Sequence, residues 1–297
     1  MKHKVIVVVG PTAVGKTKLS IRLAKRYHCE IISGDSIAIY KRLDIGSAKP
    51  TEQEMEGIPH HLIDVKNPQE EYSVADFQKA SRKILDQNPL SIICGGTGLY
   101  IQAALFNYEF QSPKRDETTA KRFENATNEE VFAYLKSLDT ELDETKIHPN
   151  NRKRVLRAIE VYETLGKSIH SFDSKKEALY SYFIVYLDMD RDELYQRIDA
   201  RVEEMLEQGL YQEVKQLAEE NIFPKGIGYR EWIPYFEGTA TYEEVVSEIE
   251  KNTRHLAKRQ ATWFRNQMTS HFYQVNPNHI DDIYRQVEQD IDRWLEE

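Results

Sequence analysis

Residues 10–17 read GPTAVGKT, and they directly follow the β-branched run VIVVV of Val5–Val9. The eight residues match the pattern GxxxxGK[ST] at every fixed position. Apolar residues then recur at helical spacing from Lys18 to Tyr27, so the stretch predicts a strand, a glycine loop and a helix in succession. This is the context that the motif requires, and it indicates a P-loop protein with an α/β fold on a parallel sheet.

The chemistry of such a loop is the binding of phosphates. Its glycines let backbone N–H groups curl around phosphate oxygens, and the start of the following helix adds positive potential. Lys16 supplies a point charge, and the hydroxyl group of Thr17 is a possible ligand of Mg²⁺. We therefore expect the loop to hold the phosphates of a di- or triphosphate ligand.

Composition sets broad limits. With 297 residues, 40% of them apolar, the chain is long enough for one large domain or two smaller ones. No run of eighteen apolar residues occurs and the N-terminus lacks a secretory cleavage site, so we expect a cytoplasmic protein without a membrane partner. The cysteines Cys29 and Cys94 lie far apart in apolar surroundings and are predicted to be reduced core residues.

Other apolar patterns extend this organisation. Long helices are predicted over Arg191–Asn221 and Thr241–Gln267, and a glycine-rich turn over Lys225–Tyr229 separates them. From 111 to 179 the apolar residues fall at helical spacing without a credible strand. We therefore predict a P-loop core of residues 1–110 and 180–297, flanked by helices and interrupted by a helical insertion of residues 111–179. Further strands are predicted over Glu30–Ser33, Pro59–Val65, Leu90–Cys94 and Tyr180–Leu187, and a helix over Leu99–Leu105.

A P-loop that hydrolyses nucleotides usually has an Asp at the end of an apolar strand, where it holds magnesium. Leu90–Cys94 ends instead in Gly95 and Gly96, which argues against a plain NTPase, although some P-loop kinases also lack this Asp. Asp35 lies just beyond the second strand, at the edge where open α/β sheets bind ligands. Its carboxylate could be a general base beside the phosphate site or a residue of a surface loop.

Two basic stretches stand out because the net charge of the whole chain is −9. Each stretch alone could be a solvated helix face or a binding site for a polyanion. Two of them in an acidic chain favour a phosphate-backbone partner such as RNA. The first contains Arg152, Lys153, Arg154 and Arg157, and the second contains Lys251, Arg254, Lys258, Arg259 and Arg265.

Several blocks in this order closely resemble the tRNA dimethylallyltransferases, also called tRNA isopentenyltransferases. They are GPTAVGKT, SGDSIAIYKRLDIGSAKP, GIPHHLID, GGTGLY, HPNNRKRVLRAIEV, GYRE and TRHLAKRQATWFRNQ, and they extend from Gly10 to about Gln267. The patterns DSxxxYxxxDIGxAKP and TRxLAKRQxTWFR are specific to that family. The resemblance implies transfer of a dimethylallyl group from dimethylallyl diphosphate to the exocyclic amine of an adenosine beside the anticodon of tRNA. The chain lacks the zinc-finger-like extension of eukaryotic members and so looks like a bacterial-type enzyme.

The resemblance also implies roles for residues. It gives catalytic roles to Asp35 as general base, to Thr97 in contact with the target base and to Lys16. The diphosphate, with Mg²⁺ on Thr17, would be held by Gly10, Thr12, Ala13, Val14, Gly15, Lys16, Thr17 and Arg201. The segments that touch tRNA would include Asp35, Ser36, Ile37, Ala38, Thr97, Lys153, Arg154, Val155, Leu156, Arg157, Gly226, Gly228, Tyr229 and Arg230.

One departure from the family pattern is Ala38, where many members have Gln, so a side-chain contact from this position is in doubt. Within the resemblance, the insertion would grip the anticodon stem-loop, and we expect a monomer. Two alternatives remain open at this stage. An adenylate isopentenyltransferase would modify a free nucleotide and would have no use for the insertion or the basic helices. A P-loop small-molecule kinase belongs to a different class of enzyme.

Overall fold

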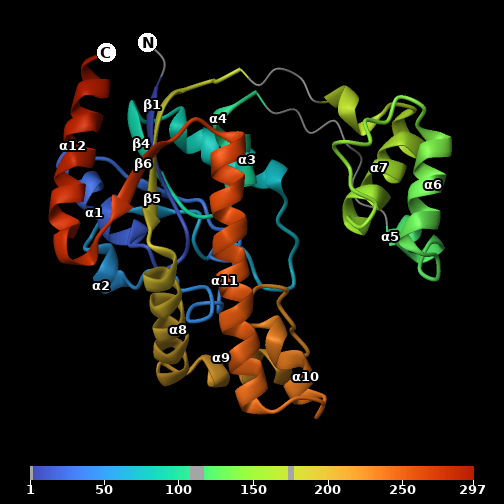
Figure 1. Ribbon diagram of the computed structural model, residues 1–297. Helices are drawn as coiled ribbons and strands as arrows, with labels where there is room; N and C mark the ends of the chain where they lie inside the picture. Colours follow the sequence, from blue (N-terminus) through green and yellow to red (C-terminus); the bar gives the residue numbers. More distant parts are fainter. Residues whose placement is uncertain (1–2, 108–116, 173–176) are drawn as a thin grey trace. The chain divides into compact units, whose positions relative to one another are not determined.

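The computed structural model describes residues 3–107, 117–172 and 177–297 of the chain (Figure 1). The chain forms two compact units. The core unit comprises Met1–Phe106 and Ala178–Glu297, and the insertion unit comprises Asn107–Glu177.

A six-stranded sheet organises the core unit, and every pair of neighbouring strands is parallel. The strand order is β3-β2-β4-β1-β5-β6, which places β1 between β4 and β5. The parallel sheet confirms the α/β class that the sequence predicts. The strands are β1 (Lys4–Val9), β2 (Ile31–Ser33), β3 (His60–His61), β4 (Leu90–Cys94), β5 (Ser181–Met189) and β6 (His271–Val275).

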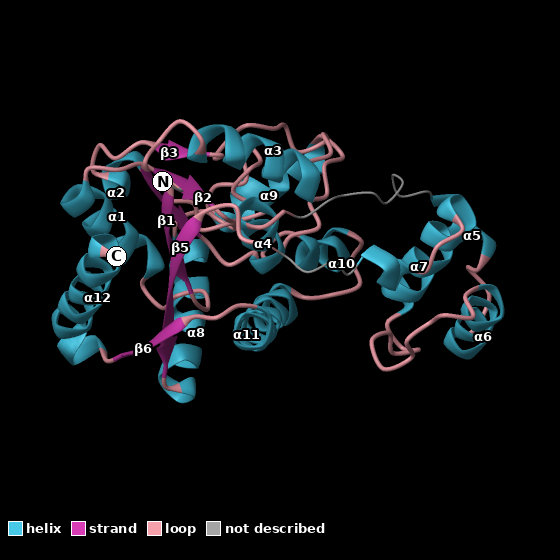
Figure 2. Ribbon diagram, turned by 90° about the horizontal axis from the view of Figure 1, so that it is seen from above, coloured by secondary structure: helices cyan, strands magenta, loops and turns pink. Residues whose placement is uncertain are grey.

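Helices cover both faces of this sheet (Figure 2). Ile6 and Val8 of β1 belong to the apolar cluster formed with α1 and α12, whereas Val5 and Val7 belong to the cluster formed with α3, α4 and α11. Because successive side chains of a strand point to opposite faces, the continuous apolar run of β1 is explained by burial on both sides. The helices of this unit are α1 (Lys16–Tyr27), α2 (Glu52–Met55), α3 (Val74–Leu85), α4 (Gly98–Leu105), α8 (Arg191–Glu207), α9 (Leu210–Glu219), α10 (Ile233–Phe236), α11 (Tyr242–Gln267) and α12 (Ile280–Glu296). Among the described residues, no helix has the length and apolar character needed to cross a membrane.

Two sequence predictions of elements were wrong in part, and one strand was missed. The strand predicted over Pro59–Val65 is reduced to His60–His61, because Leu62 and Asp64 have positive φ angles of 60° and 56° and cannot continue an extended strand. The helix predicted over Arg191–Asn221 is divided into α8 and α9 at Gly209, whose φ is 104°. The edge strand β6 was not predicted, since its five residues are mostly exposed and carry a weak apolar signal.

The insertion unit is helical in its described part. Its helices are α5 (Glu117–Arg122), α6 (Asn128–Leu138) and α7 (Arg152–Leu165), followed by a 3-10 turn at Ile169–Phe172. Val131, Leu135, Val155 and Ile159 pack between α6 and α7 as a small core of their own. The start of α6 is fixed by a capping box, in which Thr127 accepts from the backbone of Glu130 and the Glu130 carboxylate accepts from Thr127.

Each of the strands β1, β2 and β4 is followed directly by a glycine, and two of these glycines leave no room for a side chain. Gly10 follows β1, Gly34 follows β2 and Gly95 follows β4. A Cβ atom added to Gly95 would lie 2.3 Å from the carbonyl carbon of Gly34, and one added to Gly10 would lie 2.4 Å from the carbonyl oxygen of Leu187. The chain order also reverses beside β1, which is the usual place for a ligand site in such sheets.

Replacing Gly95 by Ala is expected to destabilise the core unit, because backbone atoms of Gly34 cannot move away as a flexible side chain would. Overpacking of this kind costs about 1–3 kcal/mol, measurable as a lower free energy of unfolding in urea. Gly34→Ala is the matched control, since its added Cβ would lie 3.3 Å from the side-chain atom Cγ2 of Ile93, and we expect a smaller loss. Wild-type stability of Gly95→Ala would show that the strand ends can separate.

Candidate active site

The loop between β1 and α1 presents backbone N–H groups to open space. Gly10, Ala13 and Gly15 have positive φ angles of 147°, 64° and 101°, which turn the chain tightly between strand and helix. Gly15 is the N-cap of α1, and no side chain caps the first turn of the helix. The first N–H groups of α1 and its positive end are therefore available to an anion.

Lys16 lies at the start of α1 and turns back over the loop. Its Nζ donates to the carbonyl oxygen of Pro11 at 2.7 Å. The surrounding chain removes water from the amine and lowers the pKa of Lys16 to about 8, and the Arg201 guanidinium also lowers it, while Cys94 and Asp35 act in the opposite direction. The charge of Lys16 is thus poorly compensated, which suits it to an anionic ligand.

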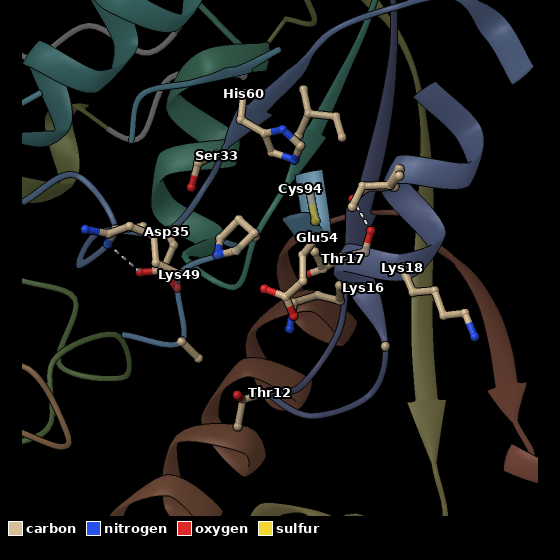
Figure 3. A pocket seen from close by; sticks show the side chains of 18 of the residues that line it. Thr12, Lys16, Thr17, Lys18, Ser33, Asp35, Lys49, Glu54, His60 and Cys94 are labelled. Carbon is tan, nitrogen blue, oxygen red and sulfur yellow. Dashed lines mark hydrogen bonds between the residues drawn. The ribbon is translucent and has the colours of Figure 1, made fainter. Parts of the chain in front are cut away.

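A cavity of about 550 Å³ opens over this loop and is called the loop cavity below. In Figure 3, Asp35 and Lys49 lie on the side of the cavity opposite Lys16 and Thr17. Thr12 and Glu54 also line the cavity. Helix α8 contributes two further cations. Burial lowers the pKa of Arg201, and the neighbouring Arg197 lowers it as well. The lining of the loop cavity includes Thr12, Ala13, Gly15, Lys16, Thr17, Ser33, Asp35, Ala38, Lys49, Cys94, Arg197, Arg201 and Tyr284.

A second cavity of about 470 Å³ adjoins the first and is called the helix cavity, because α8 and α11 form much of its wall. Thr12, Lys16, Asp35, Ser47, Ala48 and Arg201 line both cavities. The two spaces therefore meet beside these six residues. The lining of the helix cavity also includes Ser36, Ile37, Gly46, Thr97, Gly226, Gly228, Arg230, Arg259, Gln260 and Trp263.

Asp35 stands at this junction on the loop that follows β2. Its Oδ1 accepts from the backbone N–H groups of Ile37 at 2.8 Å and Ala38 at 3.4 Å, a local turn that fixes the carboxyl group. No other hydrogen bond of this carboxylate is found among the described residues, and it borders both cavities. The structure thus gives Asp35 a place at the site, where the sequence had left a surface loop equally possible.

Thr97 holds two segments of the site together. Its Oγ1 accepts from the backbone N–H of Ser36 at 3.1 Å and donates to the Ser36 hydroxyl at 3.3 Å. Thr97 precedes α4 without capping it and lines the helix cavity. The structure therefore brings Asp35, Ser36 and Thr97 together, as the resemblance implied.

Some predicted contact residues expose little or no side-chain surface. Val14 and Tyr229 are buried, and Ala38 is only 4% exposed. The side chain of Val155 lies in the core of the insertion unit, so a tRNA contact through that side chain is excluded. Contacts at these positions could involve only backbone atoms or, for Ala38, its small surface on the loop cavity.

The basic residues of α7 differ in their availability. Lys153 and Arg154 are exposed, and Leu156 is half-buried. Arg157 is ion-paired with Glu160 at 2.8 Å. Arg152 donates to Asn128 and to the carbonyl oxygen of Phe123, so it stabilises the insertion unit itself. Lys153 and Arg154 are thus the exposed cations of this group.

The basic run on α11 is less free of acidic neighbours than its sequence suggests. Arg254 pairs with Asp199 of α8, and Arg265 pairs with Asp188 of β5 at 2.6 Å. Arg259 lines the helix cavity. Arg254 and Arg265 are therefore ion-paired with partners from elements remote in sequence, which the local spacing of charges does not report.

Sequence reasoning also missed several residues of the site. Arg197 lies one helical turn before Arg201, and this i,i+4 spacing is a signal that could have identified it. Tyr284 reaches the loop from α12 and donates to the carbonyl oxygen of Gly15 at 3.3 Å, with no local sequence signal. Cys29 and Cys94 are both free thiols, but Cys94 lines the loop cavity and is not simply a core residue.

Residues 38–267 match the model of the IPP transferase family. The chain belongs to this family. The match confirms the family that the sequence motifs predict. Among similar IPP transferases, the tRNA dimethylallyltransferase of Bacillus subtilis (strain 168) is 46% identical over 290 residues, which cover 93% of this chain and 92% of that protein. The tRNA dimethylallyltransferase of Anoxybacillus flavithermus is 43% identical over 290 residues, or 94% and 93% of the two chains.

Solved structures of this family have the same fold. A tRNA isopentenylpyrophosphate transferase from Staphylococcus epidermidis aligns with a TM-score of 0.69 and 40% identity over 97% of this chain and 99% of its own. A eukaryotic dimethylallyltransferase described as acting on tRNA aligns with a TM-score of 0.77 and 31% identity over 91% of this chain and 73% of its own. The similarity therefore extends over nearly the whole chain.

Lys16→Ala is expected to weaken the binding of inorganic diphosphate roughly ten- to hundredfold, because hydrogen bonds to charged groups contribute about 1.5–3 kcal/mol. Isothermal titration calorimetry in the presence of Mg²⁺ measures this affinity. Lys83→Ala is the control, since it removes the same charge from the exposed surface of α3. Unchanged affinity of Lys16→Ala would mean that the loop is not the diphosphate site.

Proposed function

We propose that this protein transfers a dimethylallyl group from dimethylallyl diphosphate to the exocyclic amine of the adenosine adjacent to the anticodon in tRNA, with release of diphosphate. One observation carries the proposal beyond family membership. Two cavities of different lining meet beside Lys16, Asp35 and Arg201, so two substrates can approach one point from different sides. A reaction between a diphosphate donor and a base needs this arrangement.

The loop cavity suits the donor. Its backbone N–H groups, the positive end of α1 and the side chains of Lys16, Arg197 and Arg201 can surround a diphosphate. As the bond between the allylic carbon and the diphosphate oxygen breaks, negative charge grows on the diphosphate. Groups already directed at that position stabilise the charge without reorganisation.

The residues present also fit Mg²⁺, which prefers oxygen ligands and takes many of them from substrate and water. The hydroxyl groups of Thr17 and Ser33 and the carboxylate of Asp35 line the loop cavity. In the described part of the chain, no group of three His, Cys, Asp or Glu side chains could hold a metal alone. Thr17 together with the diphosphate would hold the ion, which when bound neutralises charge on the leaving group.

Asp35 is the proposed general base. An exocyclic aromatic amine is a weak nucleophile, so removal of its proton while the nitrogen–carbon bond forms assists the reaction. The oxygen of Asp35 that is not engaged by Ile37 and Ala38 can accept this proton. The donor lies on one side of Asp35 and the helix cavity on the other, which supports its role between the two substrates.

The helix cavity is proposed to take the acceptor base. An adenine in a stacked anticodon loop has to leave the stack to enter an enclosed site, at a cost of a few kcal/mol. Aromatic Trp263 and the polar groups of Thr97 and Gln260 line this cavity and can contact a base. We further propose that Lys153 and Arg154 of the insertion unit grip phosphates of the anticodon stem and offset that cost.

Two competing functions are less well supported. An enzyme that modifies a free adenine nucleotide has no need of the insertion unit or its exposed cations. The relatives named tRNA dimethylallyltransferase match this chain over 93% and 94% of its length. A kinase would transfer a phosphoryl group and consume ATP. The donor and the acceptor of the reaction therefore discriminate among the three functions.

Incubation of the protein with dimethylallyl diphosphate, Mg²⁺ and unmodified tRNA is expected to produce dimethylallyl adenosine, detected by mass spectrometry of the tRNA nucleosides. One diphosphate should be released for each modified base without ATP. AMP as acceptor should react slower by orders of magnitude, because it lacks the phosphates that the insertion unit would bind. Equal rates with AMP and tRNA would identify an adenylate-modifying enzyme.

Asp35→Asn is expected to lower turnover by about 10²- to 10⁴-fold, the usual effect of losing a general base. The Oδ1 of Asn can still accept from Ile37 and Ala38, so the loop and the affinity for diphosphate should be retained. Single-turnover rates at saturating substrates measure the effect. Asp143→Asn is the control, because Asp143 also accepts from the N–H two residues later, at 3.1 Å, but lines neither cavity. A near-wild-type rate of Asp35→Asn would remove its catalytic role.

The double variant Lys153→Ala/Arg154→Ala tests the tRNA contact of the insertion unit. Each lost phosphate contact should flatten the dependence of log affinity on log salt by about 0.7 to 0.9, so the pair should change the slope by roughly twice that amount. Filter binding of tRNA at several salt concentrations gives the slope. Lys121→Ala/Lys136→Ala, on α5 and α6, is the matched control. If both double variants keep the wild-type slope, α7 presents only a solvated face.

A further inference from the structure

The carboxylate of Glu213, on α9, accepts four hydrogen bonds from two different loops. Its Oε2 accepts from the backbone N–H groups of Asp44 at 3.0 Å and Ile45 at 2.9 Å. Its Oε1 accepts from the N–H of Gly46 at 3.2 Å and from the hydroxyl of Tyr229 at 2.7 Å. Bonds to a charged acceptor are stronger than neutral ones, so this carboxylate is a firm junction between the loops.

The two loops form part of the wall of the helix cavity. Gly46, Ser47 and Ala48 line it from the first loop, called the 44–48 loop, and Gly226 and Gly228 line it from the second, called the 226–230 turn. Their contact leaves no spare room. A Cβ added to Gly46 would lie 2.6 Å from the Tyr229 ring, and one added to Gly228 would lie 3.2 Å from the carbonyl oxygen of Gly46.

Tyr229 joins the loops beneath the cavity wall. Its hydroxyl donates to Glu213 and is also hydrogen-bonded to the backbone of Ser47. The ring is only 1% exposed, and neither Tyr229 nor Glu213 lines either cavity. Burial raises the pKa of Tyr229, so its hydroxyl remains a proton donor. Both side chains therefore act on the cavity only through the loops that they hold.

Each loop has a separate internal support. Lys49 donates to the carbonyl oxygen of Tyr40 at 2.9 Å and to carboxylates of Asp44 and Asp64 at 2.6 Å each, on the side of the loop cavity. The buried Glu231 accepts from the N–H of Gly228 at 2.9 Å and so fixes the 226–230 turn. What these supports leave undetermined is the position of one loop relative to the other.

We propose that Glu213 is a positioning residue which, with Tyr229, fixes the 44–48 loop against the 226–230 turn and thereby sets the entry of the acceptor base into the helix cavity. The proposal rests on the function proposed above. Ser47 and Ala48 of the 44–48 loop also line the loop cavity. Because Lys49 anchors that side of the loop through Tyr40, Asp44 and Asp64 without Glu213, loss of the Glu213 junction should affect the acceptor far more than the diphosphate.

The test compares Glu213→Gln, Tyr229→Phe and their combination with Glu219→Gln, a control carboxylate exposed on the same helix. The Gln side chain has only one oxygen. It can accept either from Asp44 and Ile45 or from Gly46 and Tyr229, and the other pair of contacts is lost. Either single substitution should raise KM for tRNA at least fivefold, while the affinity for inorganic diphosphate stays within twofold of wild type. KM for tRNA in the double variant should be no more than twofold higher than in the more impaired single variant, because both substitutions break the same junction.

Glu219→Gln should keep the wild-type KM for tRNA. The proposal is overturned if KM for tRNA in Glu213→Gln and Tyr229→Phe stays within twofold of wild type. It is equally overturned if affinities for tRNA and diphosphate fall together with thermal stability, since that describes general loss of structure. These outcomes are separate from failure of the proposed function, which would appear as absence of dimethylallyl transfer by the wild-type protein itself.

Discussion

The close approach of the strand ends at one edge of the parallel sheet is the constraint on which the site depends. β1 is buried on both faces and pairs with β4 and β5, so its carboxyl end cannot shift. Gly10, Gly34 and Gly95 allow the chain to leave three strands at nearly the same place. The glycine loop starts at Gly10, Asp35 follows Gly34, and Thr97 lies two residues after Gly95. The sheet therefore brings these three parts of the site close together.

The positive charge around the loop cavity follows from the same geometry. The start of α1 points its uncapped N–H groups into the loop cavity, and α8 adds Arg197 and Arg201 one helical turn apart. Burial lowers the pKa of Lys16 to about 8, and the nearby Arg201 lowers it further. In the proposed function, these cations would stabilise the negative charge that grows on a leaving diphosphate. A chain with a net charge of −9 can thus contain a local anion site.

The second cavity shows how residues outside the reaction shape it. The 44–48 loop and the 226–230 turn come from distant parts of the chain and carry the family motifs DIGSAKP and GYRE. Glu213 and Tyr229 hold them together from outside the cavity. Similar indirect support comes from α12, whose Tyr284 reaches Gly15 and whose Glu288 pairs with Arg22 of α1. The helix that follows the glycine loop, α1, is thereby fixed by the last helix of the chain.

The sequence by itself determined the P-loop motif, the α/β class and the family, because these depend on local spacing and on apolar periodicity. It also located Lys16, Asp35, Thr97 and Arg201. Only the tertiary structure decided that Asp35 borders two cavities, since that depends on elements more than a hundred residues apart.

The same limit explains what the sequence could not decide. Ion pairs such as Arg254 with Asp199 and Arg265 with Asp188 join residues separated by 55 and 77 positions, so the charges available on a helix face cannot be read from a local run of basic residues. The short strand at His60–His61 ends where Leu62 adopts a positive φ, which periodicity does not report. Local patterns specify elements, whereas the contacts between distant elements specify which side chains reach the site.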